Sequence, residues 1–437
     1  MVVKNNLYQN NIKMKDYSGR AQKIQNRIME LASCSDDAHQ LSRIFGTKSF
    51  MDASNKIALW MQEAGLQTYT DNIGNIRGRL RSTNPDAKTF VIGSHFDTVI
   101  NAGNYDGALG ILAGLDIVEN IQAQKSELPF NIEIIAFSEE EGVRFHAAYL
   151  GSKVVAGCFD DHLLEINDDD ENTLSQVLET MEHDATRLAE DRIPVNEWLG
   201  YLEIHIEQGP ILFEKNISVG MVKAIAGQKR IEINFVGEAG HAGTVPMNMR
   251  ADALCAAAHF IVAVEEYALH EKRNIVATVG KINVPNSAIN VIPGSTYCSL
   301  DLRSPDAELL SDAYEAMNKI CEEICRKRKI YFEWRLIQET DPVVCDHDLR
   351  SLLSKSIKDR DIEVVKLVSG AGHDAVTISQ VAPVAMLFVK CFKGISHNPL
   401  ENVEIDDIAV VSEVADNFIR RLARSSEKSK RERLFSK

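Results

Sequence analysis

The amino-acid sequence predicts an α/β protein whose chain is interrupted by a smaller α+β domain. Before residue 227 and after residue 337, short apolar runs typical of buried strands alternate with segments of helical periodicity. Residues 227–337 instead predict the order strand, helix, strand, strand, helix, strand, which is typical of a split βαβ module. We therefore expect one domain made of residues 1–226 and 338–437, into which residues 227–337 are inserted as a second.

The elements of the first domain follow from the spacing of apolar residues. Residues 16–66, with one break, and residues 108–123 carry them at helical spacing, and a closing helix is expected near residues 408–422. The acidic insert at residues 168–171 is expected to be exposed. Strands are expected at apolar or alternating runs that end in polar or glycine-rich loops, at residues 66–79, 90–92, 130–137, 202–206, 219–224 and 384–389.

The inserted domain differs in its pattern. Residues 229–236 alternate strongly between apolar and polar, as in an antiparallel strand with one face exposed. Long helices are expected over residues 252–272 and 306–327, and further strands at residues 275–284 and 296–302.

Composition limits the classes of function. Of the 437 residues, 45% are hydrophobic and 25% are charged, which is ordinary for a globular protein. The net charge of −15 argues against nucleic acid as a partner, because sequence-independent binding needs a basic surface. The C-terminus is the exception, and we expect a solvated helix end and a disordered extension there. Its basic residues are Arg420, Arg421, Arg424, Lys428, Lys430, Arg431 and Arg433.

Cysteine usage and apolar runs indicate the compartment. None of the eight cysteines forms a C-x-x-C pair, so we expect reduced core thiols in a reducing compartment. The N-terminus has no apolar run of the secretory type. The longest apolar run, residues 381–389, is too short to cross a bilayer and contains Pro383. A cytoplasmic protein without a membrane partner is the expectation.

The first candidate site lies where the strand at residues 90–92 ends. His95 and Asp97 follow this strand, and Asp106 stands eleven residues after His95 in a glycine-rich loop before a helix. In α/β sheets, ligands bind outside the carboxyl ends of the strands. An imidazole and two carboxylates are suitable metal ligands there. A buried histidine hydrogen-bonded to an aspartate is the alternative.

Three further strand ends carry side chains of the same kind. Glu139, Glu140 and Glu141 follow the strand at residues 130–137, and His205 and His397 follow or end later strands. Three imidazoles, an aspartate and at least two glutamates suit two divalent ions with one carboxylate left over. Such sites lower the pKa of bound water, and the spare carboxylate moves its proton to the leaving nitrogen. For the glutamate run, a solvated loop is the alternative.

Six motifs in order resemble those of the M20 metallopeptidase/amidohydrolase family, over residues 20–425. They are similar to its ureido-hydrolysing branch, which holds allantoate amidohydrolases, N-carbamoyl-L-amino-acid hydrolases, ureidoglycolate amidohydrolases and β-ureidopropionases. The resemblance implies a mixed-sheet α/β metallohydrolase catalytic domain with an inserted ferredoxin-like lid and dimerisation domain. The motifs are G-S-H-F-D-T-V, E-E-E-G-V-R-F, L-G-S-K, H-I-E-Q-G-P, G-H-A-G-T-V-P-M and S-G-A-G-H-D-A.

The resemblance also implies two divalent metal ions per subunit, zinc or manganese first, with cobalt or nickel as alternatives. In it, Asp106 bridges the two ions, and the Asp106–Gly107 peptide is expected to be cis. His95 and His205 complete the protein ligands of one ion, and Glu141 and His397 complete those of the other.

The remaining residues of the predicted centre surround these ligands. Counting back from Gly142 makes Glu140 the general base and Glu139 a flanking carboxylate. Asp97 is expected to orient His95 through the free nitrogen of its ring.

Substrate contacts are implied mainly in the inserted domain. Arg303 is expected to bind the substrate carboxylate with support from Asn290, and His241 to donate to the oxyanion. The alternatives are a surface charge at a strand end for Arg303 and a loop residue for His241. Gln208 and backbone groups at Gly370 and Ala371 are expected near the ureido group. For His373, a role next to the metal site and a packed position in a loop both stay open.

The expected partners are a small ureido-carboxylate and a second copy of the chain. The resemblance implies a homodimer formed through the inserted domain, with His241 reaching the active site of the neighbouring subunit. The leading hypothesis is hydrolysis of a ureido C–N bond with release of ammonia and carbon dioxide, most closely that of an allantoate amidohydrolase. The branch's other activities come next, and an M20 dipeptidase or aminoacylase and a non-catalytic binding protein are the remaining alternatives.

Overall fold

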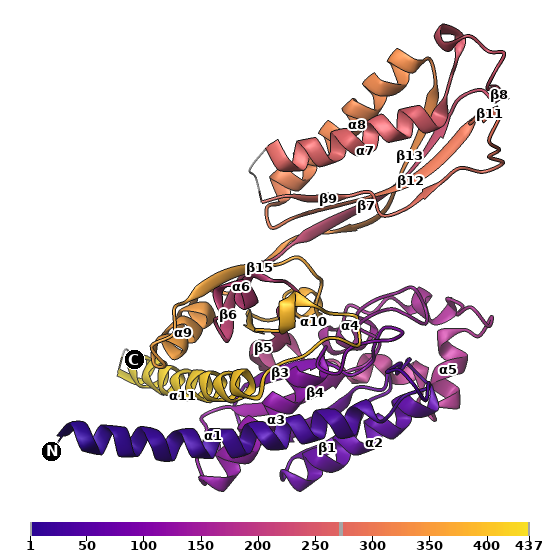
Figure 1. Cartoon of the computed structure of the whole chain (residues 1–437). Coiled ribbons are helices and arrows are strands. Elements are labelled where there is room, and N and C mark those ends of the chain that lie inside the picture. The colour runs from indigo at the N-terminus through magenta and orange to yellow at the C-terminus, as the bar shows by residue number, and fades with distance from the viewer. Residues whose placement is uncertain (1, 271–273, 436–437) are drawn as a thin grey trace. The chain divides into compact units, whose positions relative to one another are not determined.

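The computed structural model describes residues 2–270 and 274–435, and the chain forms two compact units (Figure 1). Unit 1 consists of Met1–Lys223, Cys345–Leu367 and His373–Lys437. Unit 2 consists of Ala224–Val344 and Val368–Gly372.

A nine-stranded mixed sheet has the order β1-β2-β4-β3-β5-β16-β6-β14, with β15 also paired to β6. The pairs β3–β4, β3–β5 and β5–β16 are parallel, whereas β1–β2, β2–β4, β6–β16 and β6–β14 are antiparallel. The strands are β1 (Gln67–Thr70), β2 (Ile76–Leu80), β3 (Thr89–His95), β4 (Asn131–Phe137), β5 (Trp198–Ile206), β6 (Val219–Ile225), β14 (Val343–Val344), β15 (Val365–Ser369) and β16 (Val384–Val389). The central strands are buried almost throughout, which explains their continuous apolar runs.

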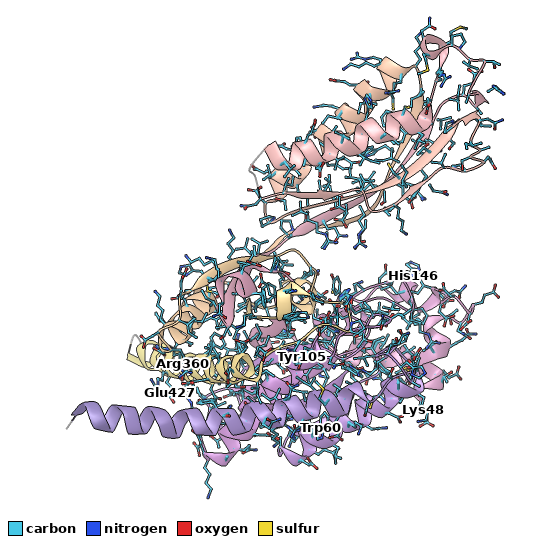
Figure 2. The ribbon with its side chains drawn as sticks, in the orientation of Figure 1. Lys48, Trp60, Tyr105, His146, Arg360 and Glu427 are labelled. Atoms are coloured by element: carbon cyan, nitrogen blue, oxygen red, sulfur yellow. The ribbon has the colours of Figure 1, made fainter. Side chains whose placement is uncertain are left out.

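Helices accompany this sheet in unit 1. They are α1 (Val2–Ala32), α2 (Lys48–Glu63), α3 (Ala108–Ala123), α4 (Leu150–Ala156), α5 (Leu174–Thr180), α6 (Ile211–Lys215), α9 (His347–Lys358), α10 (Asp374–Ile378) and α11 (Ile405–Phe435), with short 3₁₀ turns at Asp161–Glu165, Ala185–Glu190, Val195–Glu197 and Phe392–Gly394. The helix α2 is amphipathic: it buries Trp60 and leaves Lys48 exposed (Figure 2).

The helix α3 is buried along most of its length and lies directly against β5. A Cβ atom at Gly110 would stand 2.1 Å from the carbonyl oxygen of Ile204, so only glycine permits this approach. The close packing fixes the start of α3 and therefore the loop that enters it from β3.

Unit 2 is a ferredoxin-like α+β module. Its sheet has the order β10-β12-β7-β13, with β9 also paired to β12, and all its described pairings are antiparallel. Alternate residues of β7 and β12 are buried in a core that they share with α7 and α8. The elements are β7 (Gly227–Val236), β8 (Gly240–His241), the 3₁₀ turn Met247–Met249, α7 (Ala253–His270), β9 (Val276–Thr278), β10 (Ile282–Asn283), β11 (Val291–Ile292), β12 (Ser295–Ser304), α8 (Ala307–Arg328) and β13 (Tyr331–Thr340).

The mixed-sheet α/β fold with an inserted α+β module is confirmed, and some local expectations need correction. Helix α11 continues to Phe435, so the disordered extension expected before that residue is wrong, because the helical pattern continues through the basic residues. Asp168 of the acidic insert is buried rather than exposed, because Arg144 pairs with it at 3.0 Å. All eight cysteines are free as expected, but Cys158 and Cys255 are exposed rather than in the core.

Within the part of the chain that the structure describes, no helix is long and apolar enough to cross a membrane.

Candidate metal centre

Four strands of unit 1 place the candidate ligands. His95 ends β3, His205 lies next to the end of β5, and the glutamate run begins directly after β4 and Ser138. His397 lies in the loop after β16. Because β3, β4, β5 and β16 run parallel, their carboxyl ends meet at one edge of the sheet, and the predicted residues come together there.

One oxygen of Asp106 faces two imidazoles. The Nε2 atom of His205 lies 3.0 Å from Asp106 Oδ1, and that of His95 lies 3.6 Å from the same oxygen. The two Nε2 atoms are 3.5 Å apart. Together these three atoms form a cluster of metal-ligand geometry in which all three residues are buried.

The other oxygen of Asp106 faces a second set of candidate ligands. His397 Nε2 lies 3.2 Å from Asp106 Oδ2 and 3.3 Å from Glu141 Oε1. Atoms of these three residues form another possible metal cluster. Asp106 therefore lies between two sets of candidate ligands, grouped as the sequence resemblance implies.

The hydrogen bonds of the imidazoles test whether this set suits a cation. His205 Nδ1 is 2.9 Å from the carbonyl oxygen of Ile206, and His95 Nδ1 is 3.0 Å from that of Asp97. A carbonyl only accepts, so each Nδ1 carries the hydrogen and, in the neutral ring, Nε2 presents a lone pair. These lone pairs face Asp106 Oδ1, a buried acceptor without a hydrogen-bond donor among the described residues. Electron pairs that converge in this way fit a divalent metal ion.

The electrostatics of the cluster agree with this fit. Burial lowers the pKa of His205, but the nearby negative carboxylate of Asp106 outweighs this effect, and the pKa lies above its ordinary value. Burial raises the pKa of Asp106, whereas its contacts with His205, His397 and His95 bring it well below its ordinary range. Asp106 is therefore an ionised carboxylate that attracts positive charge.

The three glutamates point to different places. Glu139, with a φ of +47°, turns back to accept hydrogen bonds from the backbone N–H groups of Arg144 and Phe145 at 3.1 and 3.3 Å. A carboxylate oxygen of Glu140 lies within 4.8 Å of a ring nitrogen of His95 and of a carboxylate oxygen of Glu141. Burial raises the pKa of Glu140, His95 lowers it and Glu141 raises it further, so it ends well above its ordinary value. This arrangement favours Glu140 as the group that takes up a proton.

Asp97 contacts the free ring nitrogen of His95, as expected, and the contact is made by its backbone carbonyl. His95 Nδ1 bonds to the backbone carbonyl of Asp97, whereas the carboxylate lies 3.8 Å away. The two carboxylate oxygens instead accept the backbone N–H groups of Glu140 and Glu141, each at 3.1 Å. Asp97 thus orients His95 through its main chain and joins it to the glutamate run through its side chain.

The turn after Asp106 depends on Gly107. Its φ is +65°, and a Cβ atom there would stand 2.3 Å from the carbonyl oxygen of His95 and 2.6 Å from its ring. The expected cis peptide between Asp106 and Gly107 is wrong, since the described residues include no cis peptide. The positive φ of the glycine provides the tight turn with trans peptides.

Sequence reasoning missed several side chains around Asp106. Ser396 donates to Asp106 Oδ2 at 2.8 Å, and Glu401 accepts from the backbone of the same loop. Both residues lie close to His397 in the sequence, and this proximity to a predicted ligand could have identified them as part of the site. Glu203 and Asp374 are also buried in unit 1 without having been singled out. Gln208 was predicted to contact the ureido group of the substrate. In the structure its Nε2 donates to Asp106 Oδ2 at 3.1 Å.

The predicted substrate contacts of unit 2 fall into two groups. His241 and Asn290 are neighbours, because His241 pairs with Val291 in β8–β11 and the carbonyl oxygen of Asn290 accepts from Ala242 at 2.8 Å. Near the end of strand β12, Arg303 donates to the carbonyl oxygen of Gly370 at 2.6 Å.

Asp301 holds the guanidinium of Arg303 through both carboxylate oxygens, at 2.9 and 3.0 Å. Ala371 lies in the same loop as Gly370, and its carbonyl oxygen accepts from Ser369 at 2.9 Å.

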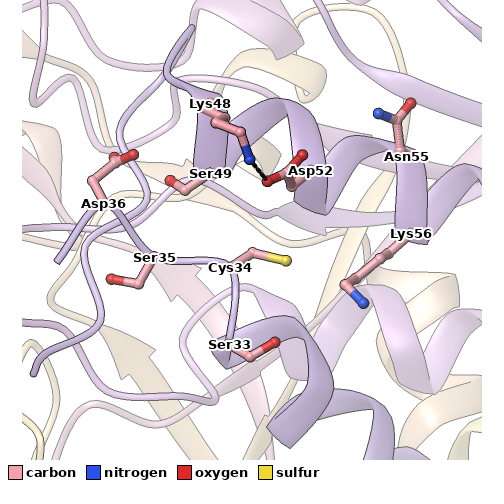
Figure 3. Close-up of a pocket in the computed structure, with 9 residues that line it drawn as sticks. All are labelled: Ser33, Cys34, Ser35, Asp36, Lys48, Ser49, Asp52, Asn55 and Lys56. Carbon is pink, nitrogen blue, oxygen red and sulfur yellow. Dashed lines mark hydrogen bonds and ion pairs between the residues drawn. The ribbon is translucent and has the colours of Figure 1, made fainter. Parts of the chain in front are cut away.

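Two cavities are lined by none of the candidate metal ligands. One, of about 590 Å³, is lined by residues such as Cys34, Ser49 and the Lys48–Asp52 ion pair, and none of the predicted site residues lines it (Figure 3). The other, of about 670 Å³, lies on the sheet of unit 2 and is lined in part by Arg303 and Gly370.

Comparisons with known proteins agree with the geometry. The model of peptidase family M20/M25/M40 matches residues 91–421. Allantoate deiminase 2 of Glycine max is 38% identical over 91% of this chain and 88% of its own. N-carbamoyl-L-amino acid amidohydrolase of Geobacillus stearothermophilus is 34% identical over 92% of this chain and 99% of its own. The crystal structure of a hydantoinase/carbamoylase family amidase from Burkholderia multivorans has a TM-score of 0.86 at 30% identity and covers 92% of this chain and 97% of its own.

Proposed function

The chain belongs to peptidase family M20/M25/M40, and from this membership we propose that it is a metal-dependent amidohydrolase that cleaves the ureido C–N bond of a small carboxylate. The observation that carries the proposal is the position of Asp106, with one oxygen toward His95 and His205 and the other toward Glu141 and His397. Two divalent ions, zinc or manganese, with cobalt or nickel as alternatives, suit these nitrogen and oxygen ligands.

Bound metal ions would polarise the carbamoyl group and make water a better nucleophile at neutral pH. The chain's own residues do the rest. Glu140 accepts the proton of the attacking water and passes it to the leaving nitrogen. Asp97 fixes the position of the His95 ring relative to the glutamate run, because it is hydrogen-bonded to both. Gln208 and Ser396 donate to Asp106 Oδ2 and restrict the rotation of its carboxylate.

Allantoate is the proposed substrate. Relatives named allantoate deiminase or allantoate amidohydrolase are 32–38% identical over 86–91% of this chain. N-carbamoyl-L-amino acids are the second candidate, because a relative named for that activity is 34% identical over 92% of the chain. Both are ureido-carboxylates whose hydrolysis releases ammonia and carbon dioxide.

A substrate screen tests this proposal. The metal-loaded chain should release ammonia from allantoate faster than from ureidoglycolate, N-carbamoyl-β-alanine or N-carbamoyl-L-amino acids. Faster turnover of an N-carbamoyl-L-amino acid would make that class the substrate. Release of ammonia from none of them would contradict the proposed reaction.

Arg303 is proposed as the carboxylate clamp, and its removal should raise KM. Asp301 holds the guanidinium in place, and Arg303 lines a cavity together with Gly370. Loss of charged hydrogen bonds worth about 1.5–3 kcal/mol predicts a KM about 10–100-fold higher in R303A, with a smaller change in kcat. The matched control is R230A, since Arg230 pairs with the same Asp301 and lines the same cavity. Equal KM values for R303A and the wild type would exclude the clamp.

His241 is proposed to act in the active site of a second copy, within a homodimer formed through unit 2. Its partner strand β11 ends just before β12, and Arg303 follows Ser295 by eight residues of that strand. At about 3.4 Å per residue, Ser295 and Arg303 lie about 27 Å apart, and His241 pairs with β11, which precedes the Ser295 end of β12. A small ureido acid cannot span that distance, which supports contributions from two copies.

Complementation between inactive variants tests this proposal. H241A and E140Q should each be nearly inactive alone, and mixing them under conditions that exchange subunits should restore activity. In the mixed dimer, one site then has an intact Glu140 from one copy and an intact His241 from the other. If His241 acts within its own copy, the mixture stays as inactive as its components, although size-exclusion chromatography shows dimers.

A further inference from the structure

Glu401 lies in the loop after β16, four residues beyond His397, and contacts a distant part of unit 1. Its side chain is 4% exposed. Its Oε1 atom accepts the backbone N–H groups of both Tyr105 and Asp106, at 2.7 and 3.1 Å. One carboxylate oxygen therefore holds the peptide groups on both sides of the Tyr105 Cα, immediately before the Asp106 side chain.

The loop is shaped around this carboxylate. A Cβ atom at Gly103 would stand 2.2 Å from Glu401 Cδ and 2.4 Å from Oε1. Those contacts are shorter than any that real Cβ atoms make, so a side chain at position 103 would displace Glu401. The absence of a side chain at Gly103 is what lets Glu401 reach the two N–H groups.

Tyr105 itself is held at two points. Its backbone N–H bonds to Glu401, and its hydroxyl contacts Asn402 Oδ1 at 3.2 Å and Gln25 Nε2 at 2.8 Å. Tyr105 is 2% exposed and lies among the side chains of unit 1 (Figure 2). Adjacent residues of one segment thus hold the backbone and the ring of the residue before Asp106.

The use of a carboxylate here needs a reason beyond packing. Oε2 of Glu401 is buried and has no hydrogen-bond donor among the described residues. Burial of a polar oxygen without a donor is unfavourable, and a smaller side chain would avoid it. Only a side chain of this length places one acceptor oxygen on both N–H groups, and this shared acceptor fixes the two peptide planes together.

We propose that Glu401 is a positioning residue for the metal centre: it fixes the backbone at Asp106 so that one carboxylate oxygen faces each set of ligands. The inference rests on the proposed metal centre and adds to it a residue outside the ligand set. Because Asp106 is shared by both sets, an error in its orientation weakens both metal positions at once. The role is carried by the Oε1 acceptor, which binds the peptide N–H groups of both Tyr105 and Asp106.

Metal affinity of the full chain tests this role without substrate. The dissociation constant for Mn²⁺ is measured by competition with a chelator, and metal per subunit is counted after dialysis. Removal of a residue that orients a ligand typically costs about 10–100-fold in affinity, which is the loss expected for E401A. E401Q keeps an acceptor oxygen and should lose less. G103A should reproduce the loss of E401A although the carboxylate is still present.

N402A is the matched control, because Asn402 holds the same Tyr105 through its ring rather than its backbone. It should bind Mn²⁺ as the wild type does. Circular dichroism of the metal-free proteins monitors folding, and if E401A does not fold, E401Q and G103A decide. In the loaded enzyme, kcat of E401A should fall more than KM rises, because the defect lies in the centre and not in substrate binding.

Folded E401A and G103A that bind Mn²⁺ with wild-type affinity would overturn the inference. So would an equal loss in N402A, since the packing of the segment would then explain the effect. Failure of the proposed reaction is distinguishable from both: the wild type would bind Mn²⁺, E401A would bind it weakly, and no ureido acid would release ammonia. A wild-type chain that binds no divalent metal would contradict both proposals.

Discussion

E140Q should lower kcat by about 10²–10⁴-fold, the usual contribution of a positioned general acid–base group, while the metal content stays at the wild-type level. Glu140 is buried beside His95 and Glu141, and its pKa is raised by burial, lowered by His95 and raised by Glu141. A glutamine keeps the shape of the side chain and its backbone bond to Asp97 but cannot carry a proton between water and nitrogen. Activity is measured as ammonia release, and metal by elemental analysis of the same sample.

E139Q is the matched control for this prediction. Glu139 is the adjacent carboxylate in the sequence, yet its Oε1 atom bonds to the backbone of its own loop, and burial raises its pKa to about 8. An amide oxygen can accept the same N–H groups, so E139Q should keep most of the wild-type kcat. If E139Q is inactive and E140Q is active, the assignment of roles within the glutamate run is shifted by one residue.

D106N should lose metal more completely than any other single substitution in the centre. Both oxygens of Asp106 face ligand sets, and the group is an ionised carboxylate. An amide offers one oxygen, and its NH₂ group places hydrogens where the second ion would lie. Since residues that merely orient a ligand cost about 10–100-fold in affinity, we expect a loss beyond about 100-fold and activity at background.

S396A provides the comparison for D106N. Ser396 bonds to Asp106 Oδ2 at 2.8 Å without belonging to a ligand set, so its loss should cost no more than the about 10–100-fold in metal affinity that is typical of a residue that orients a ligand. Elemental analysis after dialysis and the Mn²⁺ dissociation constant distinguish the two variants. If D106N retains two ions per subunit, Asp106 does not bridge them.

Much of unit 1 could be predicted because its central strands are buried on both faces. Such strands appear in the sequence as continuous apolar runs, and β16 and α3 have the expected bounds. The candidate ligands were recognisable for a related reason: each follows a strand whose carboxyl end meets the others at one edge. Their roles as ligands, base and substrate contacts stay predictions.

Other features depend on contacts between distant segments, which a local pattern does not contain. Asp168 is buried because Arg144 reaches it, although its sequence context is an acidic run. Glu401 lies next to Asp106 only in the folded chain. Asp97 was expected to orient His95, but the sequence does not tell whether its carboxylate or its backbone carbonyl contacts the imidazole; in the structure it is the carbonyl.

Metal titration of the metal-free chain, with ammonia release from allantoate as the readout, tests the central claim most directly. Asp106 between two ligand sets predicts that activity stays low with chelator and rises until about two equivalents of Mn²⁺ or Zn²⁺ per subunit are bound. Calorimetry of the same titration should show the bound ions. Full ammonia release in the presence of chelator, or two bound ions without any hydrolysis of a ureido acid, would contradict the account.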